Sequence, residues 1–258
     1  MNGAPISTVR AILVGTAAVL ALQAGVLVTP AGAQPAPPRQ ERVAFAKGAS
    51  SATINGQLQG YADIDYVVRA AAGQTISVSL KVSNRSNYFN VLPPGSVDVA
   101  MHAGQDGEPY TGMLPADGDY AVRVYLMRNA ARRNEVSTYE LTIGVTGQAL
   151  APLPASTDAL LPGTPFHASG PVTCLPMPYG DPKPQQCEGF VIRRDTDGTA
   201  TVEIPLKGMK RRILFVQGKP VASDASDTMT FTRQGDVTTV KFESGESYGI
   251  VDALIIGG

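Results

Sequence analysis

Residues 114–145 constrain the fold most strongly, because they hold two stretches in which apolar and polar residues alternate. Every second residue is apolar from Tyr120 to Leu126, and again from Tyr139 to Val145. This period of two is typical of β-strands that bury one face and expose the other to water. The sequence therefore predicts two strands joined by the segment MRNAARRN at positions 127–134, which is rich in arginine and has no acidic residue.

The same alternation recurs before residue 114 and indicates further strands. The clearest is TISVSLKV at positions 75–82, where the aliphatic residues fall on one side and the polar residues on the other. Shorter candidates lie at 42–46, 51–58, 62–68, 88–91 and 97–101. Turn residues separate these stretches and none has a convincing helical period. We therefore predict an all-β fold, an antiparallel β-sandwich of about eight short strands.

The N-terminus reads as an export signal rather than as part of a fold. One basic residue precedes an apolar run at 11–28, and a proline and the small-residue site AGA follow that run. We predict a signal peptide at 1–33, then a flexible lead-in at 34–40, and no membrane insertion after cleavage. The apolar run is almost long enough to span a bilayer, so an uncleaved anchor is the alternative.

An alanine- and proline-rich stretch divides the rest of the chain. Residues 147–163 read GQALAPLPASTDALLPG, which is low in charge and typical of an interdomain linker. We place a β-sandwich domain at 41–146 before it and a second, small β-rich domain at 164–258 after it. Strands of this second domain are expected at 190–194, 199–204, 211–217, 229–232 and 237–242.

The two cysteines, Cys174 and Cys187, flank a segment so rich in proline that a helix there is not expected. In an exported protein we predict that they form one disulfide. A metal site is the alternative, but two cysteines without a neighbouring histidine supply too few ligands, and we predict no metal.

Catalytic motifs are missing from the sequence. The two histidines, His102 and His167, fall in different predicted domains, and neither belongs to a zinc-binding spacing. Neither a nucleophile elbow nor a phosphate-binding glycine loop occurs. The 21 basic and 22 acidic residues nearly balance, which argues against general nucleic-acid binding. We predict a protein that is not an enzyme, with no cofactor and no nucleic-acid partner.

The arginine-rich segment allows two interpretations. Such a run is often a solvated hairpin tip, but a cationic loop on two rigid strands is also suited to entering an anionic cleft. A second polar loop, at 83–88, contains Arg85, Ser86, Asn87 and Tyr88. Loops of a β-sandwich can gather at one end, and the sequence leaves open whether these two do.

At these residues the chain resembles the periplasmic inhibitors of goose-type (g-type) lysozyme of Gram-negative bacteria. The similarity covers about residues 43–145. It rests on AGQTISVSL at 72–80, YFNV at 88–91, GDYAVRV at 118–124 and, most specifically, RNAARRN at 128–134. The second domain resembles a C-terminal module of exported alphaproteobacterial proteins, through KRRILFVQGKP at 210–220 and DALIIGG at 252–258.

The resemblance implies a compact sandwich, jelly-roll-like or similar to peptidase-associated modules, that acts in the periplasm. Its partner would be a g-type lysozyme, and blocking that enzyme would protect peptidoglycan. Arg128 and Arg132 match the two family arginines and would enter the active site, where glycosidase carboxylates accept charge-assisted hydrogen bonds. The polar and aromatic contacts at the rim or as an anchor would be Asn129, Ser86, Asn87 and Tyr88. Tyr88 could equally belong to the core, because it lies beside Phe89 and Val91.

Two further interpretations remain beside the inhibitor. The first fold could be a non-catalytic module of the cell envelope that recognises glycan or another periplasmic protein. In the second domain, a basic patch could bind an anionic partner, although alternating strand sides explain it as well. This patch consists of Lys207, Lys210, Arg211 and Arg212.

Overall fold

The computed structural model describes residues 1, 3, 37–105, 107–176 and 183–257. Nearly all of the predicted signal peptide and the first residues of the lead-in lie outside this range. The part of the chain from Ala36 to Gly258 forms one compact unit. Among the described residues, no helix has both the length and the apolar character needed to cross a membrane.

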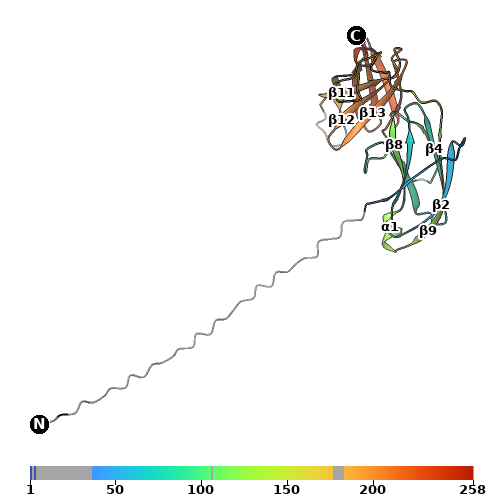
Figure 1. Ribbon diagram of the computed structural model, residues 1–258, viewed down its shortest axis with the longest axis vertical. Helices are drawn as coiled ribbons and strands as arrows, with labels where there is room; N and C mark the ends of the chain where they lie inside the picture. The colour runs from blue at the N-terminus through green and yellow to red at the C-terminus, as the bar shows by residue number, and fades with distance from the viewer. Residues whose placement is uncertain (2, 4–36, 106, 177–182, 258) are drawn as a thin grey trace. The chain divides into compact units, whose positions relative to one another are not determined.

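The first fold, residues 39–146, is a sandwich of two β-sheets (Figure 1). The five-stranded sheet has the order β1-β3-β8-β5-β6, and the four-stranded sheet has the order β2-β9-β4-β7. The first sheet contains β1 (Arg39–Arg42), β3 (Ile64–Ala70), β8 (Gly118–Leu126), β5 (Asn87–Leu92) and β6 (His102–Gly104). The second contains β2 (Ser51–Gln59), β9 (Val136–Thr146), β4 (Thr75–Val82) and β7 (Tyr110–Met113). The pairs are antiparallel except that β1 runs parallel to β3.

The sandwich core comes from the alternation that the sequence displays. Along β8 every second side chain is buried, and those of β9 alternate in the same way over most of the strand. The two sheets are joined inside the core by a hydrogen bond of 2.7 Å between the hydroxyls of Tyr66 on β3 and Tyr139 on β9. Burial raises the pKa of the Tyr139 hydroxyl, so this hydroxyl keeps its proton across the physiological pH range.

The second fold, residues 168–257, is built on one eight-stranded antiparallel sheet of order β14-β13-β12-β11-β10-β17-β16-β15. Its edge strands β14 and β15 contact each other, so that the sheet nearly closes into a barrel. The strands are β10 (Ala168–Leu175), β11 (Gln185–Arg193), β12 (Ala200–Leu206), β13 (Met209–Val216), β14 (Lys219–Ser223), β15 (Met229–Gln234), β16 (Val237–Phe242) and β17 (Ser247–Val251). The all-β prediction is confirmed for both folds.

The disulfide between Cys174 and Cys187 is present and joins the neighbouring strands β10 and β11. Several elements differ from the sequence prediction, among them the following three. Residues 97–101 are not a strand, and two five-residue helices occur, α1 (Arg128–Arg132) and α2 (Asp252–Ile256). Each helix is little more than one turn, which is too short to produce a recognisable period in the sequence.

Two of the four residues of the basic patch in the second fold, Arg211 and Arg212, are buried, whereas Lys207 and Lys210 are exposed. Arg211 donates from Nε to one carboxylate oxygen of Glu246 at 2.7 Å, and from Nη1 to Asp224 at 3.0 Å. Arg212 donates to Glu203 at 2.9 Å and to Asp224 at 3.2 Å. Both arginine side chains are at most 10% exposed. They form an internal ion-pair network, so both guanidinium groups are already paired, and an anionic partner of the patch stays an untested alternative.

A cluster of polar contacts, here called the clamp, joins the second fold to the first. The side chain of Arg194 is fully buried; its Nη1 donates to Asp117 at 3.0 Å and to the carbonyl of Leu150. Its Nε donates to the hydroxyl of Thr201 at 3.0 Å, and that hydroxyl donates to the carbonyl of Pro115 at 2.7 Å. The turn between β7 and β8 is therefore held by the second fold.

Residues of the predicted linker contact both folds. The amide of Leu150 donates to the carbonyl of Ala72 at 2.9 Å, and the amide of Leu153 donates to the carbonyl of Arg193 at 2.8 Å. The division into domains at 147–163 stays a prediction. The contacts nevertheless locate the clamp at the sandwich end that carries the β3–β4 and β7–β8 turns, which we call the clamp end.

Candidate functional site

The arginine-rich segment lies at the opposite end of the sandwich, which we call the loop end. β8 leaves the clamp end at Gly118 and reaches the loop end at Leu126, where α1 begins two residues later. Figure 1 shows α1 close to the ends of β2 and β9. The clamp is at the opposite end of the sandwich, so its contacts do not cover the surface around α1.

Helix α1 is anchored by two small residues and presents two large ones. Ala130 and Ala131 are buried in the sandwich core, whereas Arg128 and Arg132 are exposed. The two arginines are four residues apart, so they lie on the same side of the helical turn. Arg132 is in the last turn, where a cation interacts favourably with the helix dipole.

Neither exposed arginine of α1 is paired with another group in the described part of the chain. Among the described residues, Arg128 and Arg132 have no hydrogen-bonding or ion-pair partner for their guanidinium groups. Arg133, the next residue, differs: its Nε donates to Glu135 at 2.6 Å. The segment thus presents two free guanidinium groups and one that is paired.

The loop at 83–86, between β4 and β5, packs beside α1. The amide of Met127 donates to the carbonyl of Ser86 at 2.8 Å. The amide of Ser83 donates to the carbonyl of Thr138, and the amide of Thr138 donates back to the hydroxyl of Ser83, both at 2.9 Å. The two polar loops of the sequence do gather at one end of the sandwich.

Glu135 connects these loops electrostatically. Its carboxylate accepts from Asn84 Nδ2 at 2.8 Å on one side and from Arg133 on the other. The hydrogen bond from Asn84, and then the one from Arg133, hold the pKa of Glu135 below its ordinary value. The carboxylate is therefore ionised at neutral pH and neutralises Arg133 while leaving Arg128 and Arg132 free.

The weaker predicted contacts are distributed unequally. Asn129 is exposed, and its Oδ1 accepts from the amide of Ala130 at 2.7 Å. Ser86 is partly exposed beside α1. Asn87 is only 2% exposed and donates to the hydroxyl of Ser137 at 3.0 Å, so its side chain supports the loop and does not reach the surface. A contact between Asn87 and a lysozyme stays a prediction.

Tyr88 lies on β5, where it pairs with Tyr125 of β8, and both rings are half-buried. Their ring centroids are 6.5 Å apart. Asn87, the preceding residue, faces the core, so the alternation of the strand directs Tyr88 to the outer face of the five-stranded sheet. Tyr88 is thus beside the loop end rather than on it.

Two exposed residues near α1 were not among the predicted contacts. Tyr61 is 64% exposed and follows Gly60, whose amide donates to the carbonyl of Glu135 at 3.0 Å. Arg85 is exposed in the loop beside α1. An aromatic residue in a turn was the available signal for Tyr61, but only the fold brings that turn next to α1.

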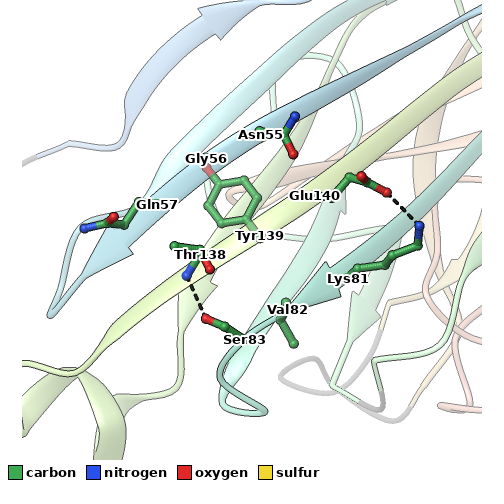
Figure 2. A pocket seen from close by; sticks show the side chains of 9 residues that line it. All are labelled: Asn55, Gly56, Gln57, Lys81, Val82, Ser83, Thr138, Tyr139 and Glu140. Carbon is green, nitrogen blue, oxygen red and sulfur yellow. Dashed lines mark hydrogen bonds and ion pairs between the residues drawn. The ribbon is translucent and has the colours of Figure 1, made fainter.

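A shallow concavity of about 710 Å³ lies on the outer face of the four-stranded sheet (Figure 2). Neutral polar side chains line much of it, and Lys81 and Glu140 within it form an ion pair of 2.7 Å. Such a surface offers hydrogen bonds but no free acid or base. Within the described residues, no three His, Cys, Asp or Glu side chains are grouped so that they could hold a metal ion.

Comparison with known proteins identifies relatives for the first part of the chain. No family model matches. The inhibitor of g-type lysozyme of Escherichia coli (strain K12) is 34% identical over 106 residues, which are 40% of this chain and 78% of that protein.

Two solved structures are also similar. PliG of Aeromonas hydrophila, a periplasmic inhibitor of g-type lysozyme, is 35% identical with a TM-score of 0.41. The match covers 43% of this chain and 98% of that one. PliG of Salmonella Typhimurium is 32% identical with a TM-score of 0.34, over 42% of this chain and 98% of that one. The second fold is outside these matches.

Proposed function

The chain belongs to the family of inhibitors of g-type lysozyme, and we propose that its first fold inhibits such a lysozyme in the periplasm. This family consists of inhibitors rather than enzymes, in agreement with the lack of catalytic motifs in the first fold. We propose further that α1 enters the acidic cleft of the lysozyme and that Arg128 and Arg132 bind the carboxylates there.

The observation that supports this mechanism is the pair of free guanidinium groups on a fixed turn. A glycosidase cleft contains carboxylates that act on the glycosidic bond. A guanidinium can donate two parallel hydrogen bonds to one carboxylate, and such charge-assisted bonds are about twice as strong as neutral ones. Arg128 and Arg132 require no rupture of an existing ion pair before they bind.

The backbone around the pair is already ordered, which favours affinity. Ala130 and Ala131 fix α1 to the core, and Met127 is bonded to Ser86. Binding therefore costs side-chain entropy of the two arginines but little backbone entropy. Around them, the exposed contacts would be Asn129, Ser86, Arg85 and Tyr61, with Tyr88 at the side of the sandwich.

Inhibition assays with goose-type and chicken-type lysozymes test the proposal. The protein used begins at residue 34, and the test variant carries Arg128→Ala and Arg132→Ala. Central interface arginines cost about 2 kcal/mol or more on truncation, so we expect the double variant to lose at least about 100-fold in affinity for the goose-type enzyme. The chicken-type enzyme should not be inhibited.

Arg133→Ala is the matched control. It removes one positive charge from the same segment, half of what the double variant removes, but Arg133 is already paired with Glu135. We expect this variant to inhibit within about threefold of the wild type, as for an exposed ion pair. If net charge, and not the free pair, determined inhibition, the control would lose about half as much binding free energy as the double variant. A wild type that inhibits neither enzyme would overturn the function and favour the envelope-binding alternative.

A further inference from the structure

A groove of about 450 Å³ lies on the outer face of the five-stranded sheet. Its floor is formed by Val67 of β3 and Ala121 of β8, which are opposite each other in the paired strands. One wall comes from the loop at 93–97, which follows β5, and the other from Gln40 and Arg42 of β1. The volume is in the range of small-molecule sites, about 300–1,000 Å³.

Two carboxylates mark the ends of the groove, and each is held by an arginine. Asp65 accepts from Nε and Nη2 of Arg123 at 2.7 and 2.9 Å, and its side chain is only 6% exposed. Asp119 accepts from Nη1 and Nη2 of Arg42 at 3.2 and 2.8 Å. These bidentate pairs fix the directions of the polar groups. Because their charges offset each other, the groove does not favour a ligand of either sign.

The ion pairs keep hydrogen-bonding capacity for a ligand. Nη1 of Arg123 is 3.9 Å from Asp98, which is too far for a hydrogen bond, and the Asp98 side chain is 87% exposed. A carboxylate can also accept more hydrogen bonds than Asp65 receives from Arg123. Donors and acceptors therefore lie side by side at fixed positions. Sugar hydroxyls suit such an arrangement, because each hydroxyl both donates and accepts.

Two tyrosines continue the same face of the sheet beyond Arg123. Tyr125 of β8 and Tyr88 of β5 are opposite each other, with ring centroids 6.5 Å apart. The Tyr125 hydroxyl donates to Asn90 at 3.3 Å, and Asn90 is opposite Arg123. Both rings are half-buried, so each keeps some exposed apolar surface beside its polar hydroxyl. The C–H face of a pyranose ring is apolar and can pack on such a surface.

We propose that this surface, which we call the glycan face, binds an uncharged chain of N-acetylated sugars, the chemistry of the peptidoglycan backbone. The stretch of β8 from Asp119 to Tyr125 is about 20 Å long at the usual rise of a strand. A ligand that contacts both the groove and the tyrosines is therefore a chain and not a single sugar. An acetamido group fits the groove, because its methyl group can pack on the floor of Val67 and Ala121 while its amide bonds to Gln40.

This inference does not rest on lysozyme inhibition. The glycan face belongs to the sheet, whereas Arg128 and Arg132 are on α1. Binding at the glycan face would hold the protein beside the polymer that lysozymes attack. The test measures binding of an oligosaccharide with no lysozyme present, so its failure and the failure of the proposed inhibition are separate results.

An NMR titration of the protein from residue 34 with chitotetraose, an uncharged oligomer of N-acetylglucosamine, tests the proposal. We expect a dissociation constant of about 0.1 to 1 mM, because an open groove leaves much of the ligand hydrated. Amide signals at 65–67 and 121–125 should shift. Cellotetraose has hydroxyls in place of the acetamido groups and should bind about tenfold more weakly, through the loss of hydrogen bonds and methyl contacts.

Ala121→Phe fills the floor of the groove without removing an ion pair and should weaken binding at least about tenfold. Thr138→Phe is the matched control, since Thr138 is exposed in the concavity of the other sheet (Figure 2). This control should bind as the wild type does. Tyr125→Leu should weaken binding about two- to tenfold, whereas Tyr125→Phe keeps the ring and should stay within about twofold. Thermal unfolding checks that each variant folds.

Several outcomes would overturn the proposal. One is a wild type that binds neither oligosaccharide, and another is a folded Ala121→Phe variant that binds like the wild type. Loss of binding in Thr138→Phe would place the ligand on the other sheet. If Ala121→Phe does not fold, the two Tyr125 variants decide, and equal binding by both would contradict the glycan face. Equal affinity for cellotetraose would contradict the assignment to N-acetylated sugars.

Discussion

Replacing Arg194 by methionine should separate the unfolding of the two folds, because the clamp depends on this fully buried guanidinium. Removing one partner from a buried ion pair commonly costs 3–5 kcal/mol or so. Here the cost is lower for two reasons. The first is that Asp117 is 30% exposed and, in the variant, still accepts the 2.9 Å hydrogen bond from the amide of Ala72, so its carboxylate remains solvated.

The second reason lies in Arg194 itself. Its Nη2 is buried and has no hydrogen-bond partner among the described residues, and burial lowers the pKa of the guanidinium. Methionine removes the buried charged guanidinium with its unpartnered Nη2 and retains much of the side-chain volume. We expect a net loss of about 2 kcal/mol, which corresponds to a decrease in Tm of roughly 4–8 °C for a chain of this size.

Urea unfolding, followed by circular dichroism and tyrosine fluorescence, measures this effect. The wild type should unfold in one transition, and Arg194→Met should show an earlier transition or two separate ones. Arg69→Met is the control, because Arg69 is 70% exposed and only 3.6 Å from Asp119 in a surface ion pair. That change should cost less than about 0.5 kcal/mol. A single transition in Arg194→Met, within the same limit of the wild type, would refute the reasoning.

Two further predictions concern the loop end and the disulfide. An NMR titration should give Glu135 a pKa below its ordinary 4.5, and Asn84→Ala should raise that pKa. Because the pKa of Glu135 is lower in the folded than in the unfolded chain, its carboxylate stabilises the fold above pH 4.5, and this contribution is lost as the pH falls through the folded pKa. An unchanged pKa in Asn84→Ala would disprove that cause. Replacing Cys174 and Cys187 by serine opens a loop with a sequence separation of 13 and should cost about 3 kcal/mol in denaturant unfolding; no loss would mean that strand pairing alone fixes β10 and β11.

Strands with regular alternation were predictable from the sequence. Residues predicted around Tyr120 and Tyr139 lie in β8 and β9, and the clear pattern at 75–82 is β4. In these strands one face is core and the other is water, so the local pattern and the fold agree. The resemblance to the g-type lysozyme inhibitors is also confirmed for the first fold.

Elements that depend on distant partners were not predictable. β6, β7, β10, β14 and β17 were missed, and residues 43–46 and 97–101 were wrongly taken as strand residues. Arg211 and Arg212 were placed on the surface because their acceptors are remote in sequence; Glu246 lies 35 residues from Arg211. Local patterns contain no information about such pairs.

The candidate site was predictable in part. The exposed arginines of α1 agree with the cationic segment read from the sequence, and their role in binding lysozyme stays a prediction. Asn87 was chosen for its polarity, but it is buried, because it begins β5 on the side that faces the core. The position of Tyr61 beside α1 depends on how the loops gather, which only the complete fold determines.

The bonds that shape the loop end also have a consequence for when it forms. Asn84 is 51 residues from Glu135, Asn87 is 50 from Ser137, and Ser83 is 55 from Thr138. Contacts of such separation form slowly, since long segments must be closed before they are gained. We therefore expect the arrangement around Arg128 and Arg132 to be acquired late in folding. On this expectation, a chain that is only partly folded would lack the surface that we propose for binding a lysozyme.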